Sequence, residues 1–342
     1  MTATYDVCVV GLGGMGSAAL KHCSEQGAKV LGIEQFPLGH DQGSSHGESR
    51  LIRQVYFEHP NYVPLLKRAY QNWDKLSEEV GEALFQRTGV VIFCPASGGE
   101  VLDGMRESAK EHNLSLEVFP AKENPFPQFA VPDNFVGAFE KDAGYLLVEK
   151  CVHAHAKAAT NLGAEIWDNT SVAAIQSQGS SFRVTTTKGD VSVKKVIVTA
   201  GPWMSQLLPE LKEDLKVCRV SQFWFDAPDL ASDGMPCFAF DYSDTGFFYG
   251  FPPLSHLGLK MAAHAPGEVL NQPEDRGDHV PAADVAAIEE TANRIFPNHN
   301  LKIKNTKLCL YTMSHNEHFI LDQSHAGGFT YLADSSGHGL KF

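Results

Sequence analysis

The stretch YDVCVVGLGGMG, residues 5–16, decides the fold class. A short β-branched run leads directly into Gly11, Gly13 and Gly16, which have the G-x-G-x-x-G spacing. Gly11 permits a tight turn, Gly13 lets the backbone approach a pyrophosphate, and Gly16 lets a helix pack closely on a strand. The stretch therefore predicts a strand, a glycine turn and a helix whose N-terminus can bind an anionic pyrophosphate.

The residues that follow complete a dinucleotide-binding pattern. SAALKHCSEQGA, residues 17–28, is typical of a helix, and KVLGIE, residues 29–34, is typical of a second strand that ends at Glu34. An acid at this point can accept hydrogen bonds from a ribose. It favours an adenosine ribose without a 2′-phosphate, so FAD and NAD are better candidates than NADP. The pattern does not distinguish FAD from NAD.

Composition and charge exclude several classes of protein. The 342 residues are 43% hydrophobic, which is enough for one large or two ordinary domains. The formal charge is -13 and no Lys/Arg cluster opposes it, so nucleic-acid binding is not expected. The seven cysteines never form a C-x-x-C pair, which favours reduced thiols in a cytoplasmic compartment. We also expect no signal peptide and no membrane span.

The polar, glycine-rich segment at residues 39–56 contains His46, Arg50 and Arg53. Arginine presents a rigid fork that suits a carboxylate or a phosphate, but surface salt bridges are common as well. From the residues alone, ligand binding and surface ion pairs are equally good interpretations. The segment after this loop has the spacing of a helix and predicts a core stripe of Tyr62, Leu65, Ala69, Trp73 and Leu76.

The rest of the chain predicts many short strands and few helices. Residues 165–201 are typical of a hairpin followed by an apolar strand, and residues 217–265 contain three aromatic-rich strand-like runs. We therefore expect a mixed α/β fold (α+β mixed), in which a Rossmann-like domain is interleaved with an antiparallel-sheet domain.

Lys260 lies in the third aromatic run. It is solvent-facing by default, but in a pocket desolvation would lower its pKa.

The stretch LCLYTMSHNEHFILD, residues 308–322, combines Cys309 with His315 and His318. A metal site would need more ligands with suitable geometry. A cysteine nucleophile would need a base within hydrogen-bond reach. The third interpretation, a buried strand cysteine beside solvated histidines, is favoured when this stretch is considered alone.

Several segments together resemble one family, the monomeric sarcosine oxidases, which include N-methyltryptophan oxidase and pipecolate oxidase. These are flavin amine oxidases of the D-amino acid oxidase-like superfamily. The similar segments occur in the order of the family: VVGLGGMGSAA, GSSHGESRLIRQVYFEHPNYVPL, TAGPW, FYGFP, LGLKM, CLYT, EHFILD and SSGHGLKF. No single segment is decisive, but their joint occurrence is highly specific.

The resemblance implies FAD attached covalently through a thioether to Cys309. It implies that the following residues bind the cofactor: Gly11, Gly13, Gly16, Glu34, Cys309, Gly337 and Gly339. It also implies an FAD-binding domain made of residues 1–82, 143–215 and 305–342. Residues 83–142 and 216–304 would then form the substrate domain.

The resemblance also implies roles for residues outside the cofactor site. Arg53 and Lys341 resemble the pair that binds the substrate carboxylate. Lys260 resembles a lysine that holds water near the flavin and promotes its reaction with dioxygen. The catalytic residues implied in this way are His46, Arg50, Tyr249, Lys260 and His264.

The implied reaction is oxidation of sarcosine or another N-methyl or cyclic secondary L-amino acid. The imine product is hydrolysed to an amino acid and an aldehyde, and dioxygen is reduced to hydrogen peroxide. Two alternatives are an FAD-dependent dehydrogenase that passes electrons to a carrier and a flavin-binding relative without catalysis. We expect a monomer that needs no metal. Because the sequence ends at Phe342 where the family continues, we also expect a truncated C-terminus.

Overall fold

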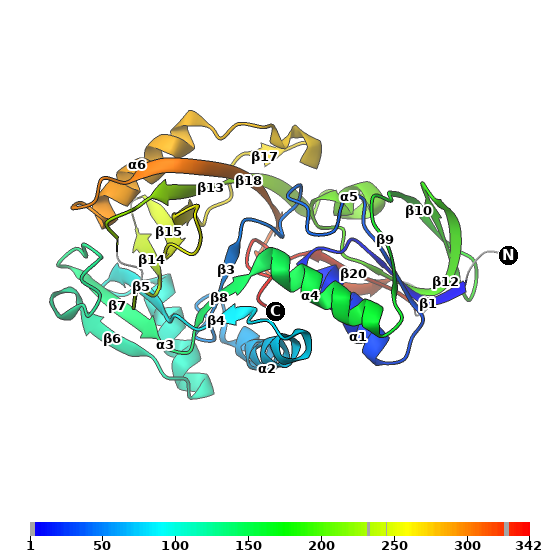
Figure 1. The fold of residues 1–342 in the computed structure, drawn as a ribbon, viewed down its shortest axis with the longest axis horizontal. Coiled ribbons are helices and arrows are strands. Elements are labelled where there is room, and N and C mark those ends of the chain that lie inside the picture. Colours follow the sequence, from blue (N-terminus) through cyan, green and yellow to red (C-terminus); the bar gives the residue numbers. More distant parts are fainter. Residues whose placement is uncertain (1–3, 231–232, 244, 325–327) are drawn as a thin grey trace.

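The computed structural model describes residues 4–230, 233–243, 245–324 and 328–342. It contains two large sheets and a small third one (Figure 1). The first sheet has the order β10-β11-β12-β1-β2-β9, with β20 beside β12 and β19 beside β20. Its strands are β1 (Thr4–Val10), β2 (Val30–Ile33), β9 (Glu165–Trp167), β10 (Val172–Ser177), β11 (Phe182–Thr186), β12 (Gly189–Val198), β19 (Ile320–Ser324) and β20 (Phe329–Asp334).

The first sheet confirms the predicted dinucleotide-binding arrangement. β1 pairs in parallel with β2 and β12, and β2 pairs in parallel with β9. Helix α1 (Gly14–Glu25) follows β1 directly, as the glycine pattern predicts. Gly11 has a φ of +87°, and a Cβ on Gly16 would lie 1.7 Å from the Gly11 carbonyl oxygen. No residue larger than glycine fits at position 16 without moving the helix away from the turn.

The second sheet is largely antiparallel and holds the aromatic-rich runs. Its order is β17-β13-β16-β15-β14-β5-β7-β6, and β18 pairs with β13. Its strands are β5 (Val90–Pro95), β6 (Glu117–Pro120), β7 (Phe135–Glu140), β13 (Leu215–Asp226), β14 (Cys237–Tyr242), β15 (Gly246–Phe251), β16 (Leu259–Ala263), β17 (Val269–Leu270) and β18 (Lys302–Ser314). The segment 305–342, predicted to belong to the FAD-binding domain, begins in this second sheet. Its first residues lie in β18, which pairs with β13 along the length of β13.

A separate three-stranded sheet pairs the strand that contains Arg50 with two strands from later in the chain. Its order is β3-β8-β4, with β3 at Ser49–Ile52, β8 at Gly144–Leu147 and β4 at Phe85–Gln86. The segment at residues 39–56, expected from its composition to be a loop, therefore contains a strand. Helix α4 (Val148–Asn161) continues from β8 and packs on α1 (Figure 1).

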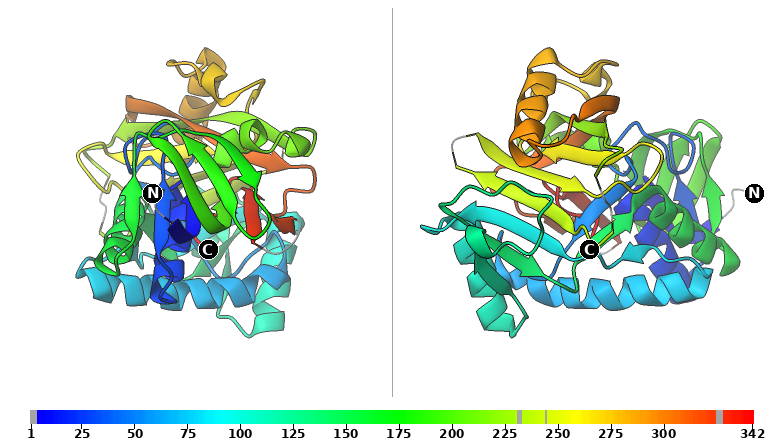
Figure 2. Two further views of the ribbon diagram at one scale, coloured as in Figure 1. Left: turned by 90° about the vertical axis from the view of Figure 1, so that its right-hand side faces the viewer. Right: turned by 60° about the vertical axis from the view of Figure 1, so that its left-hand side comes forward.

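The remaining helices cover the sheets from outside. Figure 2 shows α2, in light blue, along one side of the molecule and α6, in orange, on the opposite side. The helices are α2 (Val63–Val80), α3 (Glu100–His112), α5 (Met204–Leu207) and α6 (Ala282–Ile295), and the 3₁₀ turns are η1 (Pro60–Tyr62), η2 (Ala121–Glu123), η3 (Gly201–Trp203), η4 (Pro209–Leu211) and η5 (Pro273–Arg276). No helix in the described part of the chain is long and apolar enough to cross a membrane.

The predicted core stripe of α2 was wrong at one position. Leu65 is 56% exposed, whereas the neighbouring Leu66 is fully buried. The buried face continues through Ala69, Tyr70 and Trp73, so positions three and four apart from Leu66 point inward. Leu65 is about 100° around the helix from Leu66 and therefore faces away from the core.

We predict that Gly16→Ala destabilises the protein and weakens cofactor binding together. The added methyl group overlaps the Gly11 carbonyl, and overpacking of this kind costs about 1–3 kcal/mol. The temperature of thermal unfolding and the flavin content per chain should both fall. Gly27→Ala is the control, because its Cβ would have no neighbour within 4 Å. It should cost some stability through its positive φ but leave the flavin content unchanged. Equal flavin loss in both variants would contradict this explanation.

Candidate active site

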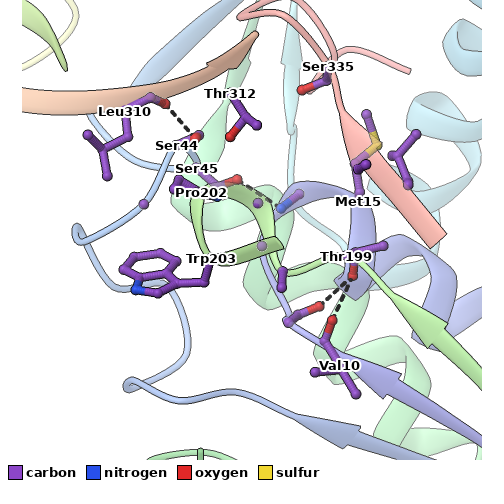
Figure 3. A pocket seen from close by; sticks show the side chains of 18 of the residues that line it. Val10, Met15, Ser44, Ser45, Thr199, Pro202, Trp203, Leu310, Thr312 and Ser335 are labelled. Carbon is purple, nitrogen blue, oxygen red and sulfur yellow. Dashed lines mark hydrogen bonds between the residues drawn. The ribbon is translucent and has the colours of Figure 1, made fainter. Parts of the chain in front are cut away.

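A cavity of about 370 Å³ lies where the first sheet meets β18, and we call it the cofactor cavity. Its walls come from the turn after β1, the end of β2, the segment 43–45, the turn after β12, and β18 with the final turn of the chain (Figure 3). Segments from the whole length of the sequence therefore contribute to it. Of the predicted cofactor residues, the cavity is lined by Gly11, Gly13, Glu34, Gly337 and Gly339.

The N-terminus of α1 opens onto this cavity. The N-cap residue Gly13 provides no side-chain hydrogen bond to the helix. The Gly14 N–H donates to the Ser45 hydroxyl at 2.9 Å, which ties the turn to the segment 43–45. An uncapped helix N-terminus lined by glycines can bind a phosphate closely. This is the environment predicted for a pyrophosphate.

Glu34 lies at the end of β2, buried on the wall of the cofactor cavity. One carboxylate oxygen accepts from the Leu12 N–H at 2.8 Å, and the other accepts from the Phe36 N–H at 3.2 Å. These bonds fix the carboxylate and leave further lone pairs for hydroxyl donors. Glycine turn, helix N-terminus and fixed acid together fit a dinucleotide, and the volume lies in the range of cofactor sites, roughly 300–1,000 Å³.

A second cavity of about 60 Å³ adjoins the first, and we call it the small cavity. The two share four lining residues: Arg50, Tyr311, Gly337 and Leu340. The small cavity brings together residues that lie far apart in the sequence, and five of the predicted catalytic and substrate-binding residues line it: Arg50, Arg53, Tyr249, His264 and Lys341. The predicted substrate and catalytic residues thus meet directly beside the cofactor cavity.

Arg53 is buried and fully engaged by neighbouring groups. Its Nη2 donates to both carboxylate oxygens of Glu58, at 2.8 and 2.7 Å, and its Nη1 donates to the Val55 carbonyl at 3.0 Å. The guanidinium carbon also lies 4.4 Å from the Tyr56 ring centroid and 4.2 Å from that of Phe57. Of the two interpretations that the sequence left open, the surface ion pair is wrong for Arg53, because its ion pair with Glu58 is buried.

Lys341 is the second buried cation on the small cavity. Its Nζ donates to the His338 carbonyl at 2.7 Å and to the Tyr56 hydroxyl at 3.2 Å. Burial lowers the pKa of Lys341 to about 7. Its charge therefore changes close to neutral pH.

The small cavity is also lined by neutral polar groups. The Nδ1 of His264 lies 3.5 Å from the Tyr311 hydroxyl, and the Tyr249 ring packs edge-on against His264. Burial lowers the pKa of His264 to about 4, so its imidazole is neutral at pH 7. Burial also raises the pKa of Tyr249, so that its phenol stays protonated.

Arg50 connects both cavities with Cys309. Its Nη2 donates to the Ser44 carbonyl at 2.8 Å and lies 3.5 Å from the Cys309 sulfur. The sulfur is also 3.7 Å from the Ser44 carbonyl oxygen. Cys309 is completely buried and lies behind the cofactor cavity, whereas the following residue, Leu310, is part of its wall.

Lys260 and His46 are both buried but lie behind the cavity walls. The Nζ of Lys260 donates to the Gly47 carbonyl and, at 3.0 Å, to the Ser49 carbonyl. Burial, together with the charge of Arg50, lowers the pKa of Lys260 well below its ordinary value. The Nε2 of His46 is 3.1 Å from the Gly43 carbonyl, and burial lowers the pKa of this histidine to about 2.

Three residues that line the cavities were not predicted from the sequence as site residues. Tyr311 lies on both cavities, two residues after Cys309, and strand alternation places the two on one side of β18. Glu58 follows Arg53 by five residues, which gives no local sign of an ion pair. His338 accepts from or donates to the Tyr56 hydroxyl at 2.5 Å, a contact 282 positions apart in the sequence.

The histidines of the stretch 308–322 do not lie beside Cys309. His315 is exposed, and the Nδ1 of His318 is 3.0 Å from the Tyr62 hydroxyl. Among the residues that the structure describes, no three His, Cys, Asp or Glu side chains form a group that could hold a metal ion.

The sequence pattern of one family, "FAD dependent oxidoreductase", matches residues 6–342. The chain belongs to this family. It is 32% identical to monomeric sarcosine oxidase of Bacillus sp. (strain B-0618) over 351 residues, which cover 100% of the chain and 90% of that relative. It is 34% identical to N-methyl-L-tryptophan oxidase of Yersinia pestis (strain Pestoides F) over 346 residues, which cover 99% of the chain and 91% of that relative.

Solved structures confirm the fold of this FAD-dependent oxidoreductase. The open form of NikD, an amino acid oxidase of nikkomycin biosynthesis, matches with a TM-score of 0.85 at 18% identity, over 99% of this chain and 92% of NikD. L-proline dehydrogenase from P. horikoshii matches with a TM-score of 0.84 at 18% identity, over 100% of this chain and 90% of that one. The predicted mixed α/β class and the predicted family resemblance are both confirmed.

We predict that a small carboxylate such as acetate binds the small cavity most tightly below pH 7. Above the pKa of Lys341, about 7, the ammonium loses its charge, so affinity should fall by up to tenfold per pH unit. Perturbation of the flavin absorption by acetate at a series of pH values measures this affinity. Lys341→Met should bind weakly, with no pH dependence near 7. The control Lys75→Met, on the surface, should keep the wild-type profile, and an unchanged profile in Lys341→Met would contradict the assignment.

Proposed function

We propose that the protein is an oxidase of sarcosine or another N-methyl or cyclic secondary L-amino acid. The amine is oxidised to an imine, which water hydrolyses to an amino acid and an aldehyde, while dioxygen is reduced to hydrogen peroxide. The observation that carries this proposal is the pair of buried cations, Arg53 and Lys341, on a small cavity that adjoins the cofactor cavity. The sarcosine and N-methyl-L-tryptophan oxidases that the chain resembles support it.

FAD would be held by the glycine turn and the fixed acid of the cofactor cavity. Gly13 and the N-terminus of α1 would approach the pyrophosphate, Glu34 would accept from the ribose, and Gly337 and Gly339 would leave room beside the final turn. When bound, FAD supplies the acceptor for two electrons from the substrate. The protein supplies binding, orientation and electrostatics.

The substrate carboxylate would bind between Arg53 and Lys341. In this structure the Nη1 of Arg53 donates to the Val55 carbonyl, and its Nη2 donates to both carboxylate oxygens of Glu58. A substrate carboxylate has the same planar geometry and can replace that partner, because guanidinium binds carboxylates in a bidentate manner. Lys341 would add a second charge below its pKa of about 7. A substrate without a carboxylate could not make these contacts.

The amine end of the substrate would face Tyr249 and His264. Both groups are uncharged at pH 7, because burial lowers the pKa of the imidazole and raises that of the phenol. A buried, neutral environment favours an uncharged amine over an ammonium ion. Only the uncharged amine has the lone pair that an imine needs. These two residues would thus select the reactive protonation state and orient it.

Two further roles concern residues behind the walls. The Arg50 guanidinium lies 3.5 Å from the Cys309 sulfur, and the sulfur lies directly behind the wall of the cofactor cavity. We therefore propose Cys309 as the point of covalent flavin attachment, assisted by Arg50 and His46. Lys260 lies behind the same wall, and its protonated form would stabilise the negative charge that develops on dioxygen.

The site has the size for a small amino acid and has additional space for a larger substituent. The small cavity of about 60 Å³ continues into a further cavity of about 260 Å³. A water molecule needs roughly 10–15 Å³ on such a scale, so the small cavity alone suits an amino acid of the size of sarcosine. The residues that line both are Phe57, Glu58, His264, Tyr311 and His338. A larger side chain would extend past them into the further cavity.

We predict that anaerobic mixing with a secondary L-amino acid bleaches the flavin and that air restores its colour with release of peroxide. Sarcosine, N-methyl-L-tryptophan and L-pipecolate form the first set, and the corresponding primary amino acids are the controls. Peroxide in proportion to the amine consumed would support an oxidase. Bleaching without peroxide would favour a dehydrogenase that uses a carrier. A flavin that none of these amines bleaches would refute the proposed function.

We predict that the flavin remains attached to the wild-type protein after acid denaturation and is lost from Cys309→Ser. The acid pellet of the wild type should be yellow, and that of the variant colourless. Cys218→Ser is a matched control, because Cys218 is a buried cysteine on the adjacent strand, paired with Tyr311 in the β13–β18 register. A yellow pellet from Cys309→Ser would contradict the attachment, and so would a colourless pellet from the wild type.

A further inference from the structure

The segment 46–50 has an uncommon backbone conformation. Gly47 has a φ of +89° and Glu48, which is not a glycine, has a φ of +67°. This left-handed region is unfavourable for a residue with a side chain, because the Cβ comes too close to the following carbonyl oxygen. A Cβ on Gly47 would lie 2.1 Å from the side-chain oxygen of Gln222. Surrounding groups must therefore hold this conformation in place.

Glu149, in the first turn of α4, holds one side of the segment. Its Oε1 accepts from the Gly47 N–H at 2.7 Å and its Oε2 accepts from the Glu48 N–H at 3.1 Å. Two successive N–H groups in this conformation form a concave anion site, which the Glu149 carboxylate fills. In return, the Glu48 carbonyl accepts from the Val148 N–H at 2.9 Å. The segment and the helix N-terminus are thus joined in both directions.

The second sheet holds the other side of the same segment. Lys260 of β16 donates to the Gly47 carbonyl and to the Ser49 carbonyl. The carboxylate of Glu48 accepts from the Trp224 indole of β13 at 2.6 Å. A carboxylate from α4 therefore binds the N–H groups, and a lysine amino group from β16 binds the carbonyls, of one strained stretch of backbone.

The residues on either side of this stretch reach the cofactor cavity. On one side, Ser45 accepts from the Gly14 N–H at the glycine turn. On the other side, Arg50 lines both cavities and donates to the Ser44 carbonyl at 2.8 Å. The positions of Ser45 and Arg50 on the cavity walls are therefore set by the backbone between them.

We propose that Glu149 is a positioning residue that holds the segment 46–50, and with it Arg50, against the cofactor cavity. Glu149 lines neither the cofactor cavity nor the small cavity, so it acts through the two N–H groups that it binds. A glutamine has nearly the same size but loses the charge and one acceptor oxygen. Because hydrogen bonds to a carboxylate are roughly twice as strong as neutral ones, this change should loosen the segment.

The test compares Glu149→Gln with Glu82→Gln in the purified holoenzyme. Glu82 contacts Lys150 of the same helix at 2.6 Å and touches no part of the segment, so its variant controls for loss of an acid near α4. We expect Glu149→Gln to contain at least about threefold less flavin per chain, because the loss of one charged hydrogen bond changes an equilibrium by about tenfold or more. The remaining flavin should show a shifted visible absorption band. Glu82→Gln should match the wild type in both.

The absorption band separates positioning from a general loss of stability, since a merely destabilised protein would keep the spectrum of its folded fraction. Wild-type flavin content and spectrum in Glu149→Gln would overturn the proposal. If Glu149→Gln does not accumulate as folded protein, Glu149→Asp decides the question, because it keeps the charge but withdraws it from the two N–H groups. Reduced flavin content and a shifted band in a natively folded Glu149→Asp would support the proposal, and wild-type values would overturn it.

The inference rests on the cofactor cavity and not on the substrate. If no secondary amine bleaches the wild-type flavin, the proposed function fails, while the comparison of flavin content and spectrum still tests Glu149.

Discussion

The contact between α1 and the turn after β1 sets the geometry on which the site depends. A Cβ on Gly16 would lie 1.7 Å from the Gly11 carbonyl oxygen, so the helix and the turn meet backbone to backbone. The Thr199 hydroxyl, just after β12, donates to the same carbonyl at 2.8 Å. Three elements are thereby fixed at one point, with the helix N-terminus directed at the cavity. Everything that lines the cofactor cavity from later in the chain is placed relative to this point.

Buried cations are the second constraint, and the structure satisfies each of them internally. Arg53 has the carboxylate of Glu58, Lys341 has a carbonyl and a phenol, and Lys260 has two carbonyls. A buried charge without partners would be strongly unfavourable, because desolvation is not compensated. In the proposed function, a substrate carboxylate would replace the Glu58 carboxylate at Arg53 and would replace neutral acceptors at Lys341.

The sequence predicted the parts of this protein that depend on local pattern. Gly11, Gly13, Gly16 and Glu34 lie within thirty residues of one another, and their spacing directly reflects a turn, a helix and a strand end. The family resemblance then identified residues from Arg50 to Lys341 that line the small cavity. The prediction that Leu65 is buried was wrong, because a stripe of apolar residues shifted by one position along the helix has nearly the same spacing. The local pattern could therefore locate α2 but could not predict which of its faces is buried.

The long-range partners could not be predicted, because they depend on how the sheets meet. Glu149 reaches Gly47 across 102 positions, and Lys260 reaches it across 213. Neither residue has a neighbour in the sequence that indicates such a contact. Lys260 is the clearest example of a residue whose contacts could not be predicted from the sequence. Its burial was one of two open interpretations, and its hydrogen bonds to the strained segment follow only from the packing of β16 against the loop before β3.

In the proposed function, the distribution of charge within the small cavity would orient an amino acid before any chemistry occurs. Arg53 and Lys341 would bind the carboxylate, whereas Tyr249 and His264 are uncharged at pH 7. A zwitterion would gain energy at the first pair through its carboxylate and would lose energy at the second pair if its nitrogen stayed protonated. Binding would therefore favour release of the ammonium proton. The carbon between the carboxylate and the nitrogen would then lie beside residues that both cavities share, among them Arg50 and Tyr311. In this proposal, the polarity of the walls links orientation to the protonation state that oxidation requires.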